Sequence, residues 1–185
     1  MEAVFLLTEL RGANSRAELI LVATDGDFAN DEIRQAAVWG LGKAGLKSYG
    51  DLLPFLEDGE RDVVLHAIAA FGHDTPEPVV VQLIDKLISG HPRHAPAVSE
   101  ALRIIGSDLV IENLIVAARE NKGAVDWTLA TLGRLPAEQV RSALKSDPLL
   151  DRLGPLLLLS STTNWVAEDT VDIDLKFLLK QNLLG

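Results

Sequence analysis

Two histidines, His91 and His94, stand three residues apart, a spacing that lets two imidazoles share one metal ion on a helix. Pro92 lies between them and Pro96 follows, and proline is poorly tolerated inside a helix. We therefore expect both histidines in a turn, and we predict no metal site there. The chain contains no cysteine, which excludes disulfides and thiolate zinc sites.

Gly40, Gly42 and Gly45 fit the glycine string of a dinucleotide-binding loop. Here the string closes a helical pattern instead of joining a strand to a helix, so the physical basis of that loop is missing. The sequence has no phosphate loop and no nucleophile elbow, and the spacing of its serines, histidines and acids selects no triad. We predict a protein that is not an enzyme, with no catalytic residue and no cofactor.

The composition is that of an acidic globular protein. Of its 185 residues 48% are hydrophobic, 24% are charged and 5% are aromatic, and the net charge is −10. Such a charge repels nucleic-acid phosphates and anionic lipids, and it favours basic protein partners. The first eleven residues carry an acid and a Thr-Glu pair where a signal peptide needs positive charge and a longer apolar run. We predict a soluble cytoplasmic protein.

The elements that would position any site are helices, because one helical phrase recurs along the chain. In residues 31–45 the apolar residues Ala37, Val38 and Leu41 follow helical spacing, Asp31 is expected to cap the start, and Gly42 and Gly45 are expected to end the helix. The matching positions are Ala67, Ile68, Phe71 and Gly72 in residues 61–72, Ala101, Leu102, Ile105 and Gly106 in residues 95–106, and Thr128, Leu129, Leu132 and Gly133 in residues 122–133.

Each repeated helix should pair with a second apolar segment, and such pairs must stack because one hairpin cannot bury both faces. The partner segments are residues 16–23, 49–56, 79–88 and 109–118. Residues 2–11 resemble a half-repeat, since Leu6, Leu7 and Leu10 have the right spacing, and residues 136–145 and 148–159 form a degenerate last pair. We predict an all-α repeat array over residues 1–161, followed by an acidic loop and capping helix at 162–185. A generic helical bundle with glycine caps is the alternative.

The phrase RQAAVWGLGKAG, residues 34–45, resembles the HEAT-repeat superfamily and is most similar to its short-repeat branch named after phycobilisome lyases. The residues that match this branch are Asp31, Arg34, Ala37, Leu41, Gly42 and Gly45. The other repeats carry Val64, Val98 or Val125 in place of the arginine. The resemblance covers roughly residues 16–135. It implies a right-handed α-solenoid (α-α superhelix) of about five antiparallel helix pairs, whose second helices line a concave surface.

The superfamily hosts scaffolds, inhibitors, lyases and other enzymes, so the resemblance alone does not select a function. A bilin lyase-like or other small-molecule-handling protein is the alternative that it implies. Relatives that are DNA glycosylases have a basic concave face, whereas this chain is acidic and has no basic run longer than two residues. Relatives that are diiron hydroxylases need several His-Glu pairs, and this sequence has none.

A chemically mixed stripe beside the core rows of the repeated helices is our predicted binding face. Trp39, Trp127 and Arg103 are its expected anchors, because tryptophan and arginine combine a large contact area with polar groups. Alternatively, both tryptophans fill gaps between repeats. The predicted partner-binding residues are Gln35, Trp39, His66, Ser99, Glu100, Arg103, Asp126 and Trp127.

We therefore predict a non-catalytic protein-binding module, such as a scaffold, an adaptor or a small acidic inhibitor of the immunity-protein kind. Its expected partner is another protein with a basic surface, and not nucleic acid or a membrane. The acidic tail around Glu168 and Asp172 either attracts this partner or acts as a solubilising end cap. The apolar first helix also permits self-association, or a place within a longer scaffold.

Overall fold

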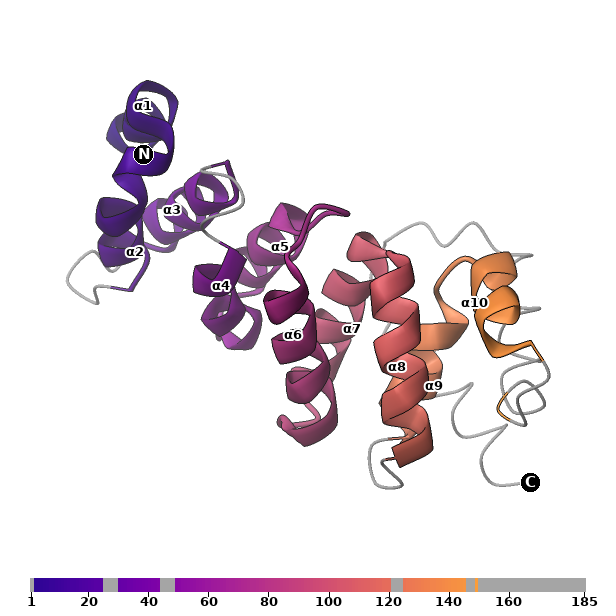
Figure 1. Cartoon of the computed structure of the whole chain (residues 1–185). Helices are drawn as coiled ribbons and strands as arrows, with labels where there is room; N and C mark the ends of the chain where they lie inside the picture. The colour runs from indigo at the N-terminus through magenta and orange to yellow at the C-terminus, as the bar shows by residue number, and fades with distance from the viewer. Residues whose placement is uncertain (1, 25–29, 44–48, 121–124, 146–148, 150–185) are drawn as a thin grey trace. The chain divides into compact units, whose positions relative to one another are not determined.

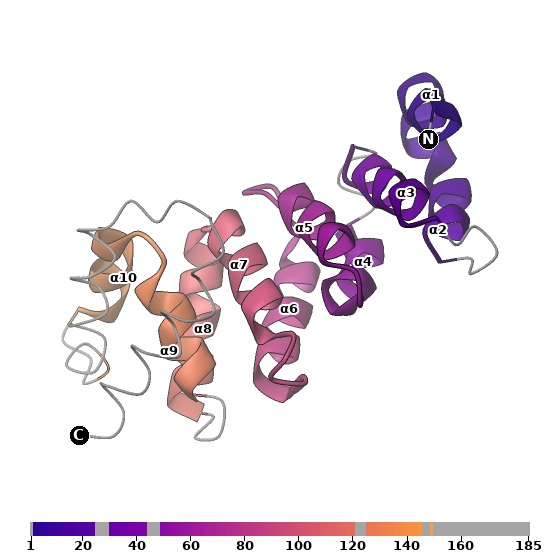
Figure 2. The ribbon, with the colours of Figure 1, turned by 180° about the vertical axis from the view of Figure 1, so that it is seen from behind.

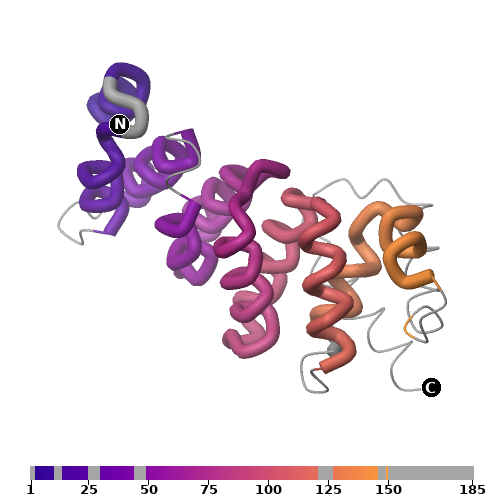
Figure 3. Tube along the Cα trace, viewed as in Figure 1, coloured from indigo at the N-terminus to yellow at the C-terminus, as the bar shows by residue number. Residues whose placement is uncertain are grey.

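The described part of the chain is entirely helical (Figures 1 and 3). A computed structural model describes residues 2–24, 30–43, 49–120, 125–145 and 149. No strand occurs within these ranges, so the predicted all-α class is confirmed for them. The elements are α1 (Glu2–Arg11), η1 (Gly12–Ser15), α2 (Arg16–Thr24), α3 (Asp31–Lys43), α4 (Tyr49–Leu52), η4 (Leu53–Glu57), α5 (Arg61–Ala70), α6 (Glu77–Ser89), α7 (Ala95–Ile105), α8 (Asp108–Glu120), α9 (Val125–Gly133) and α10 (Ala137–Leu144).

The chain forms two compact units, Met1–Leu83 and Ile84–Gly185, which we call the N-terminal unit and the C-terminal unit. The boundary between them falls inside α6. In the N-terminal unit α3 packs against α1, α2 and α5, and α5 also packs against η4. In the C-terminal unit α9 packs against α7 and α8, and α8 also packs against α10 (Figures 1 and 2).

The three core rows predicted from the repeat are buried in all four copies. The row of small residues (Ala37, Ala67, Ala101 and Thr128) is fully buried. The second row consists of Val38, Ile68, Leu102 and Leu129, and the third of Leu41, Phe71, Ile105 and Leu132; no member is more than 7% exposed. Burying one aliphatic side chain of this size contributes about 1.5–3 kcal/mol, so these rows supply much of the drive for packing. The predicted burial of these three rows is therefore confirmed.

Gly106 is the only described repeat glycine that ends its helix in the left-handed conformation. It follows α7 in the left-handed conformation, with φ 52° and ψ 19°, and its N–H donates to the Leu102 carbonyl at 3.0 Å. Gly133 is the last residue of α9, so that helix ends at its glycine as predicted, whereas Gly42 lies one residue before the end of α3, where the prediction is wrong. Gly72 follows Phe71, an extended residue that caps α5.

Gly42 serves close packing between neighbouring helices. A Cβ atom at this position would lie 2.5 Å from the Cβ of Ala70 on α5, which is closer than two such atoms can come. The glycine therefore lets α3 and α5 approach each other. The sequence pattern correctly identified Gly42 as a special position, but the role of this glycine is close packing and not the end of the helix. Gly45 lies outside the described residues.

The residue that caps α3 is Asn30, and not Asp31 as predicted. The Glu32 N–H donates to the side-chain oxygen of Asn30 at 3.0 Å, and the N–H groups of Ile33 and Arg34 donate to the Asn30 carbonyl. Asp31 takes the first helical position, where the helix dipole still favours its carboxylate.

Two arginine–aspartate pairs connect separate elements of the N-terminal unit. Arg16 of α2 donates from two of its nitrogens to Asp51 of α4, with Nη2 at 2.8 Å from Oδ1. Arg34 of α3 donates to Asp58, just after η4, and to the Ala23 carbonyl of α2 at 3.2 Å. Arg34 thus connects α3 to α2 and to the loop after η4.

The predicted helix over residues 49–56 is divided into α4 and η4. Pro54 stands at the start of η4, and proline cannot donate the backbone hydrogen bond that a continuous α-helix needs. The predicted helix at 136–145 corresponds to α10. Leu149 apart, the predicted helix at 148–159 lies outside the described residues, as does the tail at 162–185.

Candidate partner-binding surfaces

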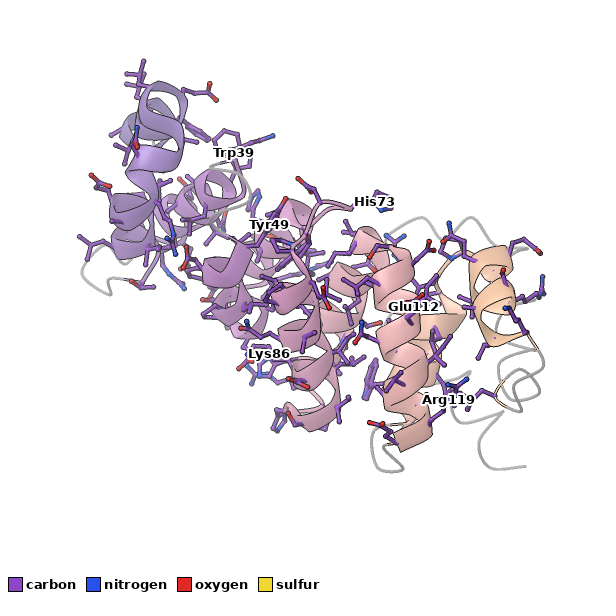
Figure 4. All side chains as sticks on the ribbon, in the orientation of Figure 1. Trp39, Tyr49, His73, Lys86, Glu112 and Arg119 are labelled. Atoms are coloured by element: carbon purple, nitrogen blue, oxygen red, sulfur yellow. The ribbon has the colours of Figure 1, made fainter. Side chains whose placement is uncertain are left out.

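Trp39 on α3 is the predicted anchor of the N-terminal unit, and its indole is half-buried. The ring of Phe5, from α1, meets it edge-on with centroids 5.1 Å apart and planes at 73°. The Lys43 ammonium lies 5.7 Å from the indole centroid. Trp39 thus partly fills the junction of α1 and α3 and partly faces solvent (Figure 4). Gln35, also half-buried, lies one turn earlier on the same face of α3.

Beside Trp39, α1 exposes three large apolar side chains that were not among the predicted site residues. Phe5 is 38% exposed, Leu6 is 58% exposed and Leu10 is 79% exposed. We call these three residues the α1 apolar surface. Leucine spacing alone indicated a packed helix here, and it gave no sign of which leucines remain uncovered.

The packed side of α1 is formed by Val4 and Thr8, because Gly40 on α3 leaves room for them. A Cβ atom at Gly40 would lie 2.5 Å from the Thr8 hydroxyl oxygen. Thr8 is buried, and its hydroxyl donates to the Val4 carbonyl at 2.9 Å, so its polar group is satisfied inside the helix. Because Val4 and Thr8 occupy the packed side of α1, Leu6 and Leu10 lie on its exposed side.

His66 lies on α5, which packs against α3, and its side chain is half-buried. Leu65, the repeat equivalent of Gln35, is exposed beside it. His73 is exposed in the loop that follows α5 (Figure 4). In the N-terminal unit the predicted residues Gln35, Trp39 and His66 therefore lie on two helices that pack against each other.

Tyr49 stabilises the N-terminal unit from within. Its ring stacks on Phe71 with centroids 6.0 Å apart, and its hydroxyl donates to the Asp74 carboxylate at 2.9 Å. Burial, and then the hydrogen bond to Asp74 and its charge, raise the pKa of Tyr49 to about 12. This pair attaches the loop after α5 to α4.

In the C-terminal unit the predicted residues Glu100 and Arg103 form an ion pair that Arg134 joins. Glu100 on α7 accepts hydrogen bonds from Arg103, one turn later, and from Arg134, just after α9. Burial acts to raise the pKa of Glu100, but the bonds and charges of the two arginines outweigh it and hold this pKa below its ordinary value. The ion pairs thus join α7 to the end of α9.

Ser99 and Trp127 also form internal contacts. Ser99 is fully buried, and its hydroxyl lies 2.8 Å from that of Thr131 on α9, which in turn donates to the Trp127 carbonyl at 2.7 Å. Ser99 therefore lies on the side of α7 that packs against α9, so the predicted stripe is not equally exposed in every repeat. The Trp127 side chain is half-buried, and Asp126 lies outside the residues whose side chains are described.

His91 and His94 lie in the turn between α6 and α7, as predicted, with ring centroids 5.8 Å apart. The backbone N–H of Arg93 donates to Nδ1 of His91 at 3.1 Å. Among the described residues no three histidine, aspartate or glutamate side chains are grouped so that they could hold a metal ion. None of the described helices is long and apolar enough to cross a membrane.

Charge is unevenly distributed between the two units. Residues 1–83 contain 14 acidic and 6 basic residues, a net charge of −8, whereas residues 84–185 contain 13 and 11, a net charge of −2. The described acids exposed on the N-terminal unit are Glu9, Asp31, Glu32, Glu57, Glu60, Asp62, Asp74 and Glu77. The described bases exposed on it are Arg16, Lys43 and Arg61, of which Arg16 is paired with Asp51.

No family model, curated protein or solved structure matches this chain.

Proposed function

We propose that this chain is a non-catalytic protein-binding module with HEAT-like α-solenoid order, which acts in the cytoplasm on a protein partner with a basic surface. The observation that carries the proposal is that the N-terminal unit combines a net charge of −8 with six of the seven large apolar side chains that are exposed among the described residues. Large exposed apolar groups in a polar surround are typical of protein-binding surfaces.

The repeat register supports the solenoid part of the proposal. Helices in equivalent repeat positions pack together within each unit, namely α3 with α5 and α7 with α9. Each of these helices buries the same three rows. Stacking of equivalent helices with a shared core is the organisation of repeat arrays.

We assign the contact surface to the N-terminal unit, around Trp39, Gln35 and His66. Trp39 offers a half-exposed indole beside the exposed Phe5, and it lies on the more acidic unit. The C-terminal candidates fit contact less well, since Ser99 is buried and Glu100 is engaged by Arg103 and Arg134. Those residues are better explained as internal links between α7 and α9.

The experiment is affinity capture with the purified chain, followed by reconstitution with the captured protein. The partner is identified at low salt and then purified, and its Kd is measured by calorimetry at two salt concentrations. We expect binding to weaken with salt, because acidic and basic surfaces attract over about 10 Å at 0.1 M ionic strength.

Trp39→Ala and Trp127→Ala form the matched pair of variants, one in each unit. Trp39→Ala should weaken binding by about 2 kcal/mol, roughly thirtyfold, as loss of an anchoring tryptophan does. Trp127→Ala should leave the Kd within about threefold of wild type. Equal losses from both variants, or a purified partner that binds equally well at high salt, would refute this assignment.

A further inference from the structure

We propose that the α1 apolar surface docks an amphipathic helix with basic flanks, supplied by the partner protein. This extends the binding surface from Trp39 on α3 to the outer side of α1. It rests on the proposed function in one respect, namely that the partner is a basic protein.

The spacing on α1 is that of a helix-binding stripe. Leu6 and Leu10 are four residues apart and lie on one side of the helix, and Ala3, also exposed, lies one turn before Leu6. A stripe with this spacing is the complement of an apolar face on a second helix. Phe5 continues the surface toward Trp39, against which its ring packs.

The net charge of the N-terminal unit favours a basic occupant. Glu9 is exposed beside Leu10, and the unit that carries α1 has a net charge of −8. A helix with lysine or arginine flanking its apolar face would gain from this field, and an acidic helix would be repelled. Anionic lipid surfaces are disfavoured for the same reason.

A second copy of this chain is a poor occupant. Two copies would bring together two units of net charge −8. A stable interface buries roughly 800 Å² on each partner, and three side chains on α1 supply only part of that area. Charge complementarity must therefore add to the apolar contact, and identical copies do not offer it.

The test uses a synthetic peptide of about 18 residues, long enough to form a helix on binding, with leucines at helical spacing and lysines elsewhere. A glutamate version of the peptide is the charge control. The protein variants are Leu6→Ser with Leu10→Ser, and Leu21→Ser as the matched control, because Leu21 is 57% exposed on α2. Circular dichroism verifies that each variant is folded.

We expect the lysine peptide to bind and the double variant to bind it roughly tenfold more weakly, with Leu21→Ser unchanged. Equal binding of the glutamate peptide, or no loss in the double variant, would overturn the inference. Binding of the chain to anionic vesicles, or a dimer in light scattering that the double variant abolishes, would assign the surface to a different occupant.

The same variants separate this inference from the proposed function. If the captured partner loses affinity for Trp39→Ala and keeps it for the double variant, the docking of a helix on α1 is wrong and the binding module remains. If the lysine peptide binds through Leu6 and Leu10 while no protein partner is captured, the proposed function fails and the preference of α1 for a basic helix stands.

Discussion

The two units of this chain contain similar helices and differ in what they leave exposed. Among the described residues, the large apolar side chains exposed on the N-terminal unit are Phe5, Leu6, Leu10, Leu21, Leu65 and Val81, whereas the C-terminal unit exposes only Val116. The N-terminal unit also carries −8 of the net charge of −10. The C-terminal unit connects its charged residues to each other, as Glu100 does with Arg103 and Arg134.

This difference shows that equivalent positions of one repeat pattern can be exposed in one unit and form internal contacts in the other. The core rows are the same in both units, so packing does not distinguish them. The predicted residues of the stripe on α3 and α5, namely Gln35, Trp39 and His66, are half-buried, and on α7 and α9 part of the stripe forms internal links. A polar or aromatic residue at a repeated position is therefore evidence for a binding site only where its neighbours leave it uncovered.

The largest effect that would sharpen this comparison is expected from Gly42→Val. The new side chain would collide with Ala70, and overpacking of this kind should destabilise the N-terminal unit by about 3 kcal/mol. Hydrogen exchange should show lost protection in α3 and α5 and retained protection in α7 to α9. Gly59→Ala is the control, since a Cβ atom there meets nothing within 4 Å. Equal loss of protection in both units would mean that they unfold together.

A smaller effect is expected from Glu100→Gln, which removes the charge that Arg103 and Arg134 share. At neutral pH we expect a loss of about 2 kcal/mol, because the Arg134 side chain is only 12% exposed and would keep its charge without a counterion. Urea unfolding measures this loss. If wild type and Glu100→Gln have the same free energy of unfolding, Glu100 and its two arginines do not stabilise the unit and are available for a partner.

The pH dependence of that loss has a definite sign. The pKa of Glu100 is lower in the folded protein than its ordinary value of 4.5, so the ion pairs stabilise the fold fully above pH 4.5. This stabilisation disappears as the pH falls through the lowered pKa. The stabilities of wild type and Glu100→Gln should therefore converge in acid.

Tyr49→Phe should have an effect of about 1 kcal/mol on the N-terminal unit, the usual contribution of one hydrogen bond. Tyr49 is the sole tyrosine of the chain, so absorbance follows its ionisation without interference. Its pKa is raised from 10.0 to about 12, so the related stability is fully present below pH 10 and is lost as the pH rises through about 12. Ionisation near pH 10 in the folded protein would contradict the bond to Asp74.

Glu138→Gln should have the smallest effect, below about 0.5 kcal/mol, because exposed ion pairs contribute little. Glu138 pairs with Arg141 at 2.9 Å on α10, but its side chain is 88% exposed. It is the matched control for Glu100→Gln within the same unit. A comparable loss in thermal unfolding from both variants would remove the distinction between internal and surface ion pairs.

The sequence was sufficient to predict the helices and their buried rows, because helical periodicity is a local property. Ala37, Ala67 and Ala101 have the same spacing to their apolar neighbours and are all fully buried. The cause of each helix end was less predictable. Asn30 caps α3 in place of Asp31, and both residue types suit that role, so the spacing could not choose between them.

The candidate site was only partly predictable, because exposure depends on contacts between distant residues. Trp39 was selected by residue type, whereas its contact with Phe5 joins helices far apart in the sequence. Leu6 and Leu10 were expected in a packed pattern, and no local signal shows that Val4 and Thr8 occupy the packed side instead. Ser99 was selected by its register and is buried, because Thr131 on α9 provides a partner for its hydroxyl.

Gly40 has a consequence for how variants of this chain should be interpreted. A Cβ atom at this position would lie 2.5 Å from the Thr8 hydroxyl oxygen, so the glycine lets the buried Thr8 pack against α3. An alanine at position 40 would displace Thr8 and disturb the packing of α1 without changing any exposed residue. A change that abolishes recognition can therefore map to a residue that no ligand touches, and a screen for contact residues would misassign it unless the solvent accessibility of α1 were measured as well.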